Sequence, residues 1–137
     1  MSEPTPKPAD VLVIFGITGD LAKKMTFRAL YRLEAADRLD CPILGVAKEP
    51  WSEDHLRAAA RAALEAIGEP VKDEIFDRLA GRLGYVHGDF ADPATYKVLA
   101  KALEGFARPL FYLEIPPALF APVVASLGQA HLTGGPR

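Results

Sequence analysis

The sequence predicts an α/β fold, a doubly wound parallel sheet with helices on both faces, and three observations support this. Four short apolar segments alternate along the chain with longer segments of helical periodicity, an order typical of parallel sheets. The first apolar segment, residues 11–15, is continuous and rich in β-branched residues, as expected of a strand buried on both faces. It runs directly into a glycine-containing turn and a helix-compatible segment.

Length, composition and charge limit the possible functions. The 137 residues fit one domain with a sizeable core. A net charge of −2 gives no electrostatic basis for binding nucleic acid or a membrane surface. No apolar run reaches 18 residues, so we expect no membrane span. The single cysteine, Cys41, cannot form an internal disulfide, which agrees with a cytoplasmic location.

The first half of the chain predicts a leader, two strands and two helices. Three prolines in residues 1–9 indicate a flexible leader before a folded domain at 10–130. We expect strands at 11–15 and 43–47, and helices at about 20–36 and 53–67, the second capped by Ser52. The apolar face of the first helix is expected to comprise Leu21, Met25, Ala29, Leu30 and Leu33, which follow 3- and 4-residue spacing.

The second half continues the alternation. We expect a short helix at about 72–82 that stops at a left-handed Gly84, and a strand at 85–88. Asp92-Pro93 is typical of a helix start, and a further strand is expected at 110–115. The last helix, at about 117–128, is expected to bury Leu119, Phe120, Val123, Val124 and Leu127. Right-handed crossovers then favour the strand order 3-2-1-4, with a flexible tail at 131–137.

The turn after the first strand carries a candidate phosphate-binding pattern. Gly16, Gly19 and Ala22 form G-x-x-G-x-x-A, a variant of the dinucleotide-binding fingerprint. Gly16 permits a tight turn, Gly19 lets the backbone approach a pyrophosphate, and Ala22 lets the helix pack closely on the strand. The helix N-terminus favours the negative charge of a phosphate.

Four stretches follow the predicted strands and therefore share one edge of the sheet: 16–23, 48–49, 89–90 and 112–117. Ligands bind at that edge in such folds. At the end of the second strand, a cation would bind the 2′-phosphate of NADP and an acid would bind ribose hydroxyls. Lys48 is followed directly by Glu49, so the sequence leaves the choice between NADP and NAD open.

Several other chemistries are disfavoured. His55, His87 and His131 show no metal-ligand spacing with Cys or acidic residues, so we expect no metal site. No G-x-x-x-x-G-K-[ST] occurs, which excludes a P-loop. No Y-x-x-x-K occurs either, which weakens the hypothesis that the chain is a short-chain reductase. That reductase, a nucleotide-sensing module and an interaction domain with a vestigial site remain alternatives.

Three segments resemble motifs of one enzyme family. The segment F-G-I-T-G-D-L-A-K-K at 15–24 resembles the nucleotide-binding signature of the glucose-6-phosphate dehydrogenases. The segment G-V-A-K at 45–48 is similar to that family's G-Y-A-R, and L-F-Y-L-E-I-P-P at 110–117 is similar to its L-F-Y-L-A-L-P-P. Their order and spread indicate the Rossmann-like coenzyme domain of that family.

The resemblance implies specific roles. Lys48 would replace the arginine that binds the 2′-phosphate of NADP, while a lysine beside Glu49 leaves NAD possible. Asp89 and Phe90 would border the adenine, and Tyr112 would lie near the nicotinamide. The pyrophosphate and ribose would be held by Gly16, Ile17, Thr18, Gly19, Asp20, Leu21, Ala22 and Lys23.

The resemblance also implies an activity for a longer parent protein. That family oxidises glucose 6-phosphate to the 6-phosphogluconolactone in the pentose phosphate pathway, as a homo-oligomer. The family's E-K-P-F-G and R-x-D-H-Y-L-G-K motifs are absent. We therefore expect a truncated chain without catalytic residues, inactive by itself, that binds the nicotinamide dinucleotide but not glucose 6-phosphate.

Overall fold

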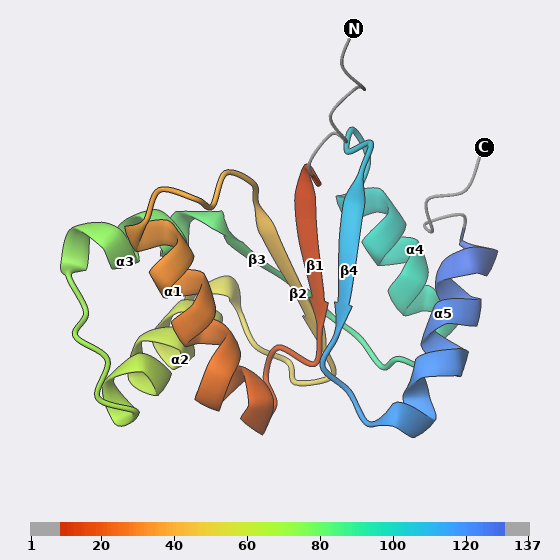
Figure 1. Cartoon of the computed structure of the whole chain (residues 1–137). Helices are drawn as coiled ribbons and strands as arrows, with labels where there is room; N and C mark the ends of the chain where they lie inside the picture. The colour runs from red at the N-terminus through yellow and green to blue at the C-terminus, as the bar shows by residue number, and fades with distance from the viewer. Residues whose placement is uncertain (1–8, 131–137) are drawn as a thin grey trace, which may run out of the picture.

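A computed structural model describes residues 9–130, so the tail predicted at 131–137 and all but one residue of the predicted leader lie outside the described residues. Four strands form one parallel sheet in the order β3-β2-β1-β4 (Figure 1). The strands are β1 (Val11–Phe15), β2 (Ile43–Ala47), β3 (Leu83–His87) and β4 (Pro109–Leu113). This confirms the predicted fold class and strand order.

The helices cover both faces of this sheet, as Figure 1 shows. One face carries η1 (Ala22–Thr26), α1 (Phe27–Ala35), α2 (Glu53–Ala66) and α3 (Asp73–Arg82); the other carries α4 (Pro93–Ala102), η2 (Pro117–Leu119) and α5 (Phe120–Gln129). Alternate residues of β1 enter the two cores: Ile14 packs with α1–α3, while Val13 and Phe15 pack with α4 and α5. Burial on both faces explains why this segment is continuously apolar.

The first helix starts at Asp20 as predicted, but of its predicted apolar face only Leu30 is buried. Leu21, Met25 and Leu33 are 47%, 57% and 39% exposed. For the positions within and after η1, the cause is this π-helical segment, which inserts an extra residue and rotates the helix. The buried Ala22 and Phe27 are therefore five residues apart, and the usual spacing resumes beyond them with Leu30, Tyr31 and Glu34.

Gly84 does not stop the preceding helix. It is a residue of β3, paired with Leu44 of β2, and the strand follows α3 directly. The side chain of Arg57, in α2, donates hydrogen bonds to the carbonyl oxygens of Ala80 and Leu83, at 2.9 and 3.3 Å. A side chain distant in sequence thus satisfies the carbonyls that a left-handed glycine would otherwise help to satisfy.

The last predicted helix is divided, and fewer of its side chains are buried than expected. A 3₁₀ turn, η2, precedes α5, and only Val123 and Leu127 of the predicted set are buried. Phe120 and Val124 are 41% and 50% exposed. Among the described residues α5 packs along one side only, so a single stripe of its apolar side chains is covered.

Candidate functional site

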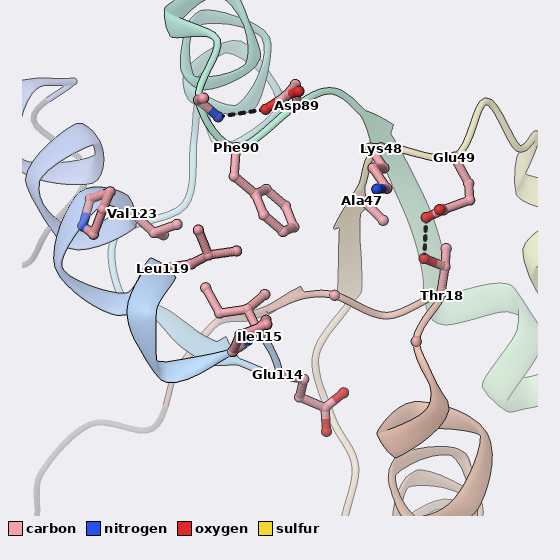
Figure 2. A pocket seen from close by; sticks show the side chains of 15 residues that line it. Thr18, Ala47, Lys48, Glu49, Asp89, Phe90, Glu114, Ile115, Leu119 and Val123 are labelled. Atoms are coloured by element: carbon pink, nitrogen blue, oxygen red, sulfur yellow. Dashed lines mark hydrogen bonds between the residues drawn. The ribbon is translucent and has the colours of Figure 1, made fainter.

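The carboxyl ends of all four strands border one cleft of about 460 Å³. Such a volume is typical of a small-molecule site. Figure 2 shows the lining side chains converging from the glycine turn, from the ends of β2 and β3, and from the segment after β4. The lining residues are Gly16, Thr18, Gly19, Ala47, Lys48, Glu49, Asp89, Phe90, Ala91, Glu114, Ile115, Pro116, Leu119, Pro122 and Val123.

The turn after β1 requires glycine at position 16. Its φ is +87°, and a Cβ there would lie 2.2 Å from the carbonyl oxygen of Glu114. The Gly16 N–H also donates to the carbonyl oxygen of Val46 at 2.8 Å. The residue therefore fits between β2 and β4 only without a side chain, in a conformation that favours glycine.

Gly19 leaves the opening of the cleft free of side-chain atoms. A Cβ at this position would meet only the carbonyl oxygen of Gly16, at 3.3 Å. This contact is tight, so a side chain at Gly19 would require the turn to shift by a few tenths of an ångström and would otherwise extend into the cleft. The helix that starts at Asp20 presents its N-terminus here, which suits a phosphate.

The end of β2 places a cation and an anion beside this turn. Lys48 is exposed and Glu49 is half-buried, and both line the cleft. The Thr18 hydroxyl donates a hydrogen bond to the Glu49 carboxylate, drawn in Figure 2. The Tyr85 hydroxyl lies 2.5 Å from the Glu49 carbonyl oxygen, to which it donates. Burial, with the nearby charge of Glu49, raises the pKa of Tyr85 to about 12, so this phenol keeps its proton.

The opposite wall is apolar. It consists of Phe90, Ile115, Leu119 and Val123 (Figure 2). The Phe90 ring centroid lies 5.5 Å from that of Phe15, and the Phe90 carbonyl oxygen accepts a hydrogen bond from Tyr96 at 2.8 Å. These contacts fix a flat apolar surface of the kind on which a planar ring can pack.

Glu114 carries the one buried polar side-chain atom without a hydrogen-bond partner among the described residues, its Oε1. Its Oε2 accepts a hydrogen bond from the Thr26 hydroxyl. Burial raises the pKa of Glu114 above its ordinary value, and the bond from Thr26 offsets part of this effect. In Figure 2 its side chain points away from Ile115 and Leu119.

The structure brings half of the predicted site residues into the cleft. Gly16, Thr18, Gly19, Lys48, Asp89 and Phe90 line it. Ile17 and Ala22 are buried behind it, and Asp20 lies exposed at the helix start.

The remaining three predicted residues lie elsewhere. Lys23 borders a separate hollow against α2. Leu21 and Tyr112 line a groove between α1 and β4. Glu114 borders both this groove and the cleft, so groove and cleft meet at that side chain.

Sequence reasoning missed several contributors to the site. The bond from Tyr85 to the Glu49 carbonyl and the apolar wall from η2 and α5 depend on segments far apart in the chain. For Glu114 a signal existed: a charged residue directly follows an apolar strand at the edge where ligands bind.

Residues 9–130 contain neither a cluster of metal ligands nor a membrane-spanning helix. That part of the chain holds no group of three or more His, Cys, Asp or Glu side chains that could bind a metal ion. Within the same range, no helix has both the length and the apolar character required to cross a bilayer.

Three independent observations indicate that the cleft can hold a dinucleotide. Gly19 lines the cleft at a helix N-terminus, a cation lies at the end of β2, and Glu114, which lines the cleft at the end of β4, carries an oxygen, Oε1, without a hydrogen-bond partner. Residues that could hold the adenosine ribose (end of β2), the pyrophosphate (end of β1) and the far end of the ligand (end of β4) thus lie in this order along the sheet edge.

The chain is similar to known proteins over most of its length. Residues 13–136 match the family model described as "Glucose-6-phosphate dehydrogenase, NAD binding domain". The chain is 58% identical over 126 residues to glucose-6-phosphate 1-dehydrogenase 1 of Mycobacterium tuberculosis, covering 90% of this chain and 26% of the relative. The chain therefore spans about a quarter of the length of the curated relatives it matches.

Two solved structures are also similar. A glucose-6-phosphate 1-dehydrogenase from Mycobacterium avium superposes with a TM-score of 0.87 at 56% identity, over 91% of this chain and 28% of that one. A glucose-6-phosphate dehydrogenase in complex with its substrate glucose-6-phosphate gives a TM-score of 0.83 at 29% identity, over 94% of this chain and 29% of that one.

Proposed function

The chain belongs to the glucose-6-phosphate dehydrogenase family, as its NAD-binding domain, and we propose that it binds NADP in the cleft, with NAD as a weaker ligand. The observation that carries this proposal is the shared position of Gly19, Lys48 and Glu49 around one opening. A pyrophosphate on the glycine turn brings the adenosine ribose toward the end of the neighbouring strand, β2. There Lys48 attracts a 2′-phosphate.

Each part of the ligand then has a partner in this chain. The helix N-terminus at Asp20 and the backbone at Gly19 hold the pyrophosphate. Asp89 and Phe90, at the end of β3, border the adenine. The carboxylate of Asp89 accepts a hydrogen bond from the Ala91 N–H at 2.8 Å, which fixes this loop and the position of the Phe90 ring.

When bound, the nicotinamide would supply the hydride acceptor, and the residues of the cleft would orient it. Orientation is the main contribution a protein makes to hydride transfer. We further propose that the longer protein oxidises glucose 6-phosphate to the lactone in the pentose phosphate pathway. In this proposal it acts in the cytoplasm as a homo-oligomer, and residues outside positions 1–137 bind the sugar and remove its hydroxyl proton.

Calorimetric titration of the purified 137-residue chain tests the binding proposal. We expect NADP to bind more tightly than NAD, and 2′,5′-ADP to compete with both. A folded chain that binds none of the three would overturn the proposal. For the longer protein, reduction of NADP that depends on glucose 6-phosphate is the expected result, and its absence would contradict the proposed activity.

A further inference from the structure

We propose that Glu114 is a positioning residue for the nicotinamide ring, whose carboxamide N–H₂ donates a hydrogen bond to Oε1. The inference rests on the proposed function, since it assumes that a dinucleotide lies along the sheet edge. It adds a contact at the end of the ligand opposite Lys48.

The position of Glu114 supports this role. It is the first residue after β4, and its N–H donates to the carbonyl oxygen of Phe15 at 2.8 Å. Glu114 therefore lies beside the end of β1, at the point where the strand order reverses between β2 on one side and β4 on the other. A dinucleotide crosses this point, with its two halves on opposite sides. Lys48 and Phe90 mark the adenosine side, so Glu114 lies on the nicotinamide side.

The hydrogen bonding of Glu114 indicates the kind of group that binds. One oxygen accepts from Thr26 and the other, although buried, has no donor among the described residues. A buried carboxylate oxygen without a donor is costly, so its missing partner is an N–H or O–H group. The nicotinamide carboxamide supplies two N–H donors, and its pyridinium ring carries a positive charge that a carboxylate attracts.

The substitution Glu114→Ala is expected to leave the fold intact, because the backbone hydrogen bond that joins Glu114 to Phe15 does not involve the side chain.

Binding measurements on the 137-residue chain with a set of related ligands test the inference. For Glu114→Ala we expect the affinity for NADP to fall roughly ten- to hundredfold, the range for a hydrogen bond to a charged group. The affinity for 2′,5′-ADP, which lacks the nicotinamide half, is expected to stay unchanged. The 3-acetylpyridine analogue of NADP lacks the amide N–H₂, so its affinity should differ little between the wild type and the variant.

Three results would overturn the inference. An equal loss for NADP and 2′,5′-ADP would show that Glu114 acts only on the structure of the cleft. An equal loss for NADP and its acetylpyridine analogue would show that the carboxamide N–H₂ is not the donor to Glu114. An unchanged affinity for NADP would show that Glu114 does not contact the ligand. Glu104→Ala, at an exposed carboxylate in the loop after α4, is the matched control. Binding of 2′,5′-ADP by wild type separates failure of this inference from failure of the proposed function.

Discussion

The hydroxyl of Thr18 donates a hydrogen bond to the carboxylate of Glu49, and this contact joins the glycine turn after β1 to the end of β2. It holds a negative charge beside Lys48, where the 2′-phosphate of NADP would bind. The side chains of Lys48 and Glu49 therefore act in opposite directions on cofactor choice.

Replacing Glu49 by glutamine is expected to shift preference toward NADP. The amide keeps an acceptor for Thr18 but removes the charge that repels a phosphate. We expect NADP affinity to rise about fivefold relative to NAD, equivalent to about 1 kcal/mol for one screened charge near a surface. Titration of both cofactors measures the ratio, with Glu104→Gln as control. An unchanged ratio would show that Glu49 does not face the 2′ position.

Replacing Lys48 by alanine is expected to have the opposite effect. NADP binding should weaken by about 1–3 kcal/mol more than NAD binding, because a charge-assisted contact to the phosphate is lost. Lys48→Arg should restore or improve NADP binding, since a guanidinium also pairs with phosphate. Equal losses for NADP and NAD in Lys48→Ala would contradict the role given to this side chain.

The two glycines of the turn are expected to respond differently to substitution. Gly19→Val should abolish nucleotide binding and leave the circular dichroism spectrum largely intact, since the new side chain meets only the Gly16 carbonyl oxygen, at 3.3 Å, and otherwise extends into the cleft. Gly16→Ala should instead destabilise the fold by about 2 kcal/mol or more, because its left-handed φ and its contact with Glu114 both exclude a Cβ. Urea unfolding and calorimetry separate the two effects. A folded Gly19→Val chain that binds normally would place the ligand elsewhere.

Tyr85→Phe is expected to reduce stability at neutral pH by about 1 kcal/mol, the usual cost of one hydrogen bond. In the unsubstituted protein, the pKa of Tyr85 is near 10.0 when the chain is unfolded and about 12 when it is folded. The folded state therefore retains a proton that the unfolded state loses, and stability falls as pH rises between these values. Urea unfolding at a series of alkaline pH values should show a shallower decline for Tyr85→Phe. Parallel declines in both proteins would mean that the phenol is not buried as described.

Glu114→Gln is expected to stabilise the fold at neutral pH. Since burial raises the folded pKa of Glu114, stability from this group is present below pH 4.5, its ordinary value, and is lost as pH rises through the folded pKa. Glutamine remains neutral throughout and can still accept the bond from Thr26. Thermal unfolding should show a gain for the variant at pH 7 that disappears in acid. A gain that persists below pH 4 would contradict this account.

The periodicity of the chain predicted most of the fold. Continuous apolar strands, the start signals at Ser52 and Asp92, and the glycines at 16 and 19 are local features, because backbone conformation and burial on two faces depend on nearby residue types. Their order then restricted the topology to right-handed crossovers. These signals also located the sheet edge and six of the cleft residues, including Lys48 and Phe90.

The buried face of the first helix and the side-chain hydrogen bonds of the cleft depend on contacts between distant segments, so only the tertiary structure decided them. The π-helical turn rotated the first helix, which exposed Met25 and buried Glu34. That carboxylate is paired with Arg82 of α3 at 2.6 Å, a contact that no local pattern specifies. The bond from Thr18 to Glu49 and the unpartnered oxygen of Glu114 are likewise invisible in the sequence. A hydrogen bond depends on the distance between two atoms, and only the folded chain sets that distance.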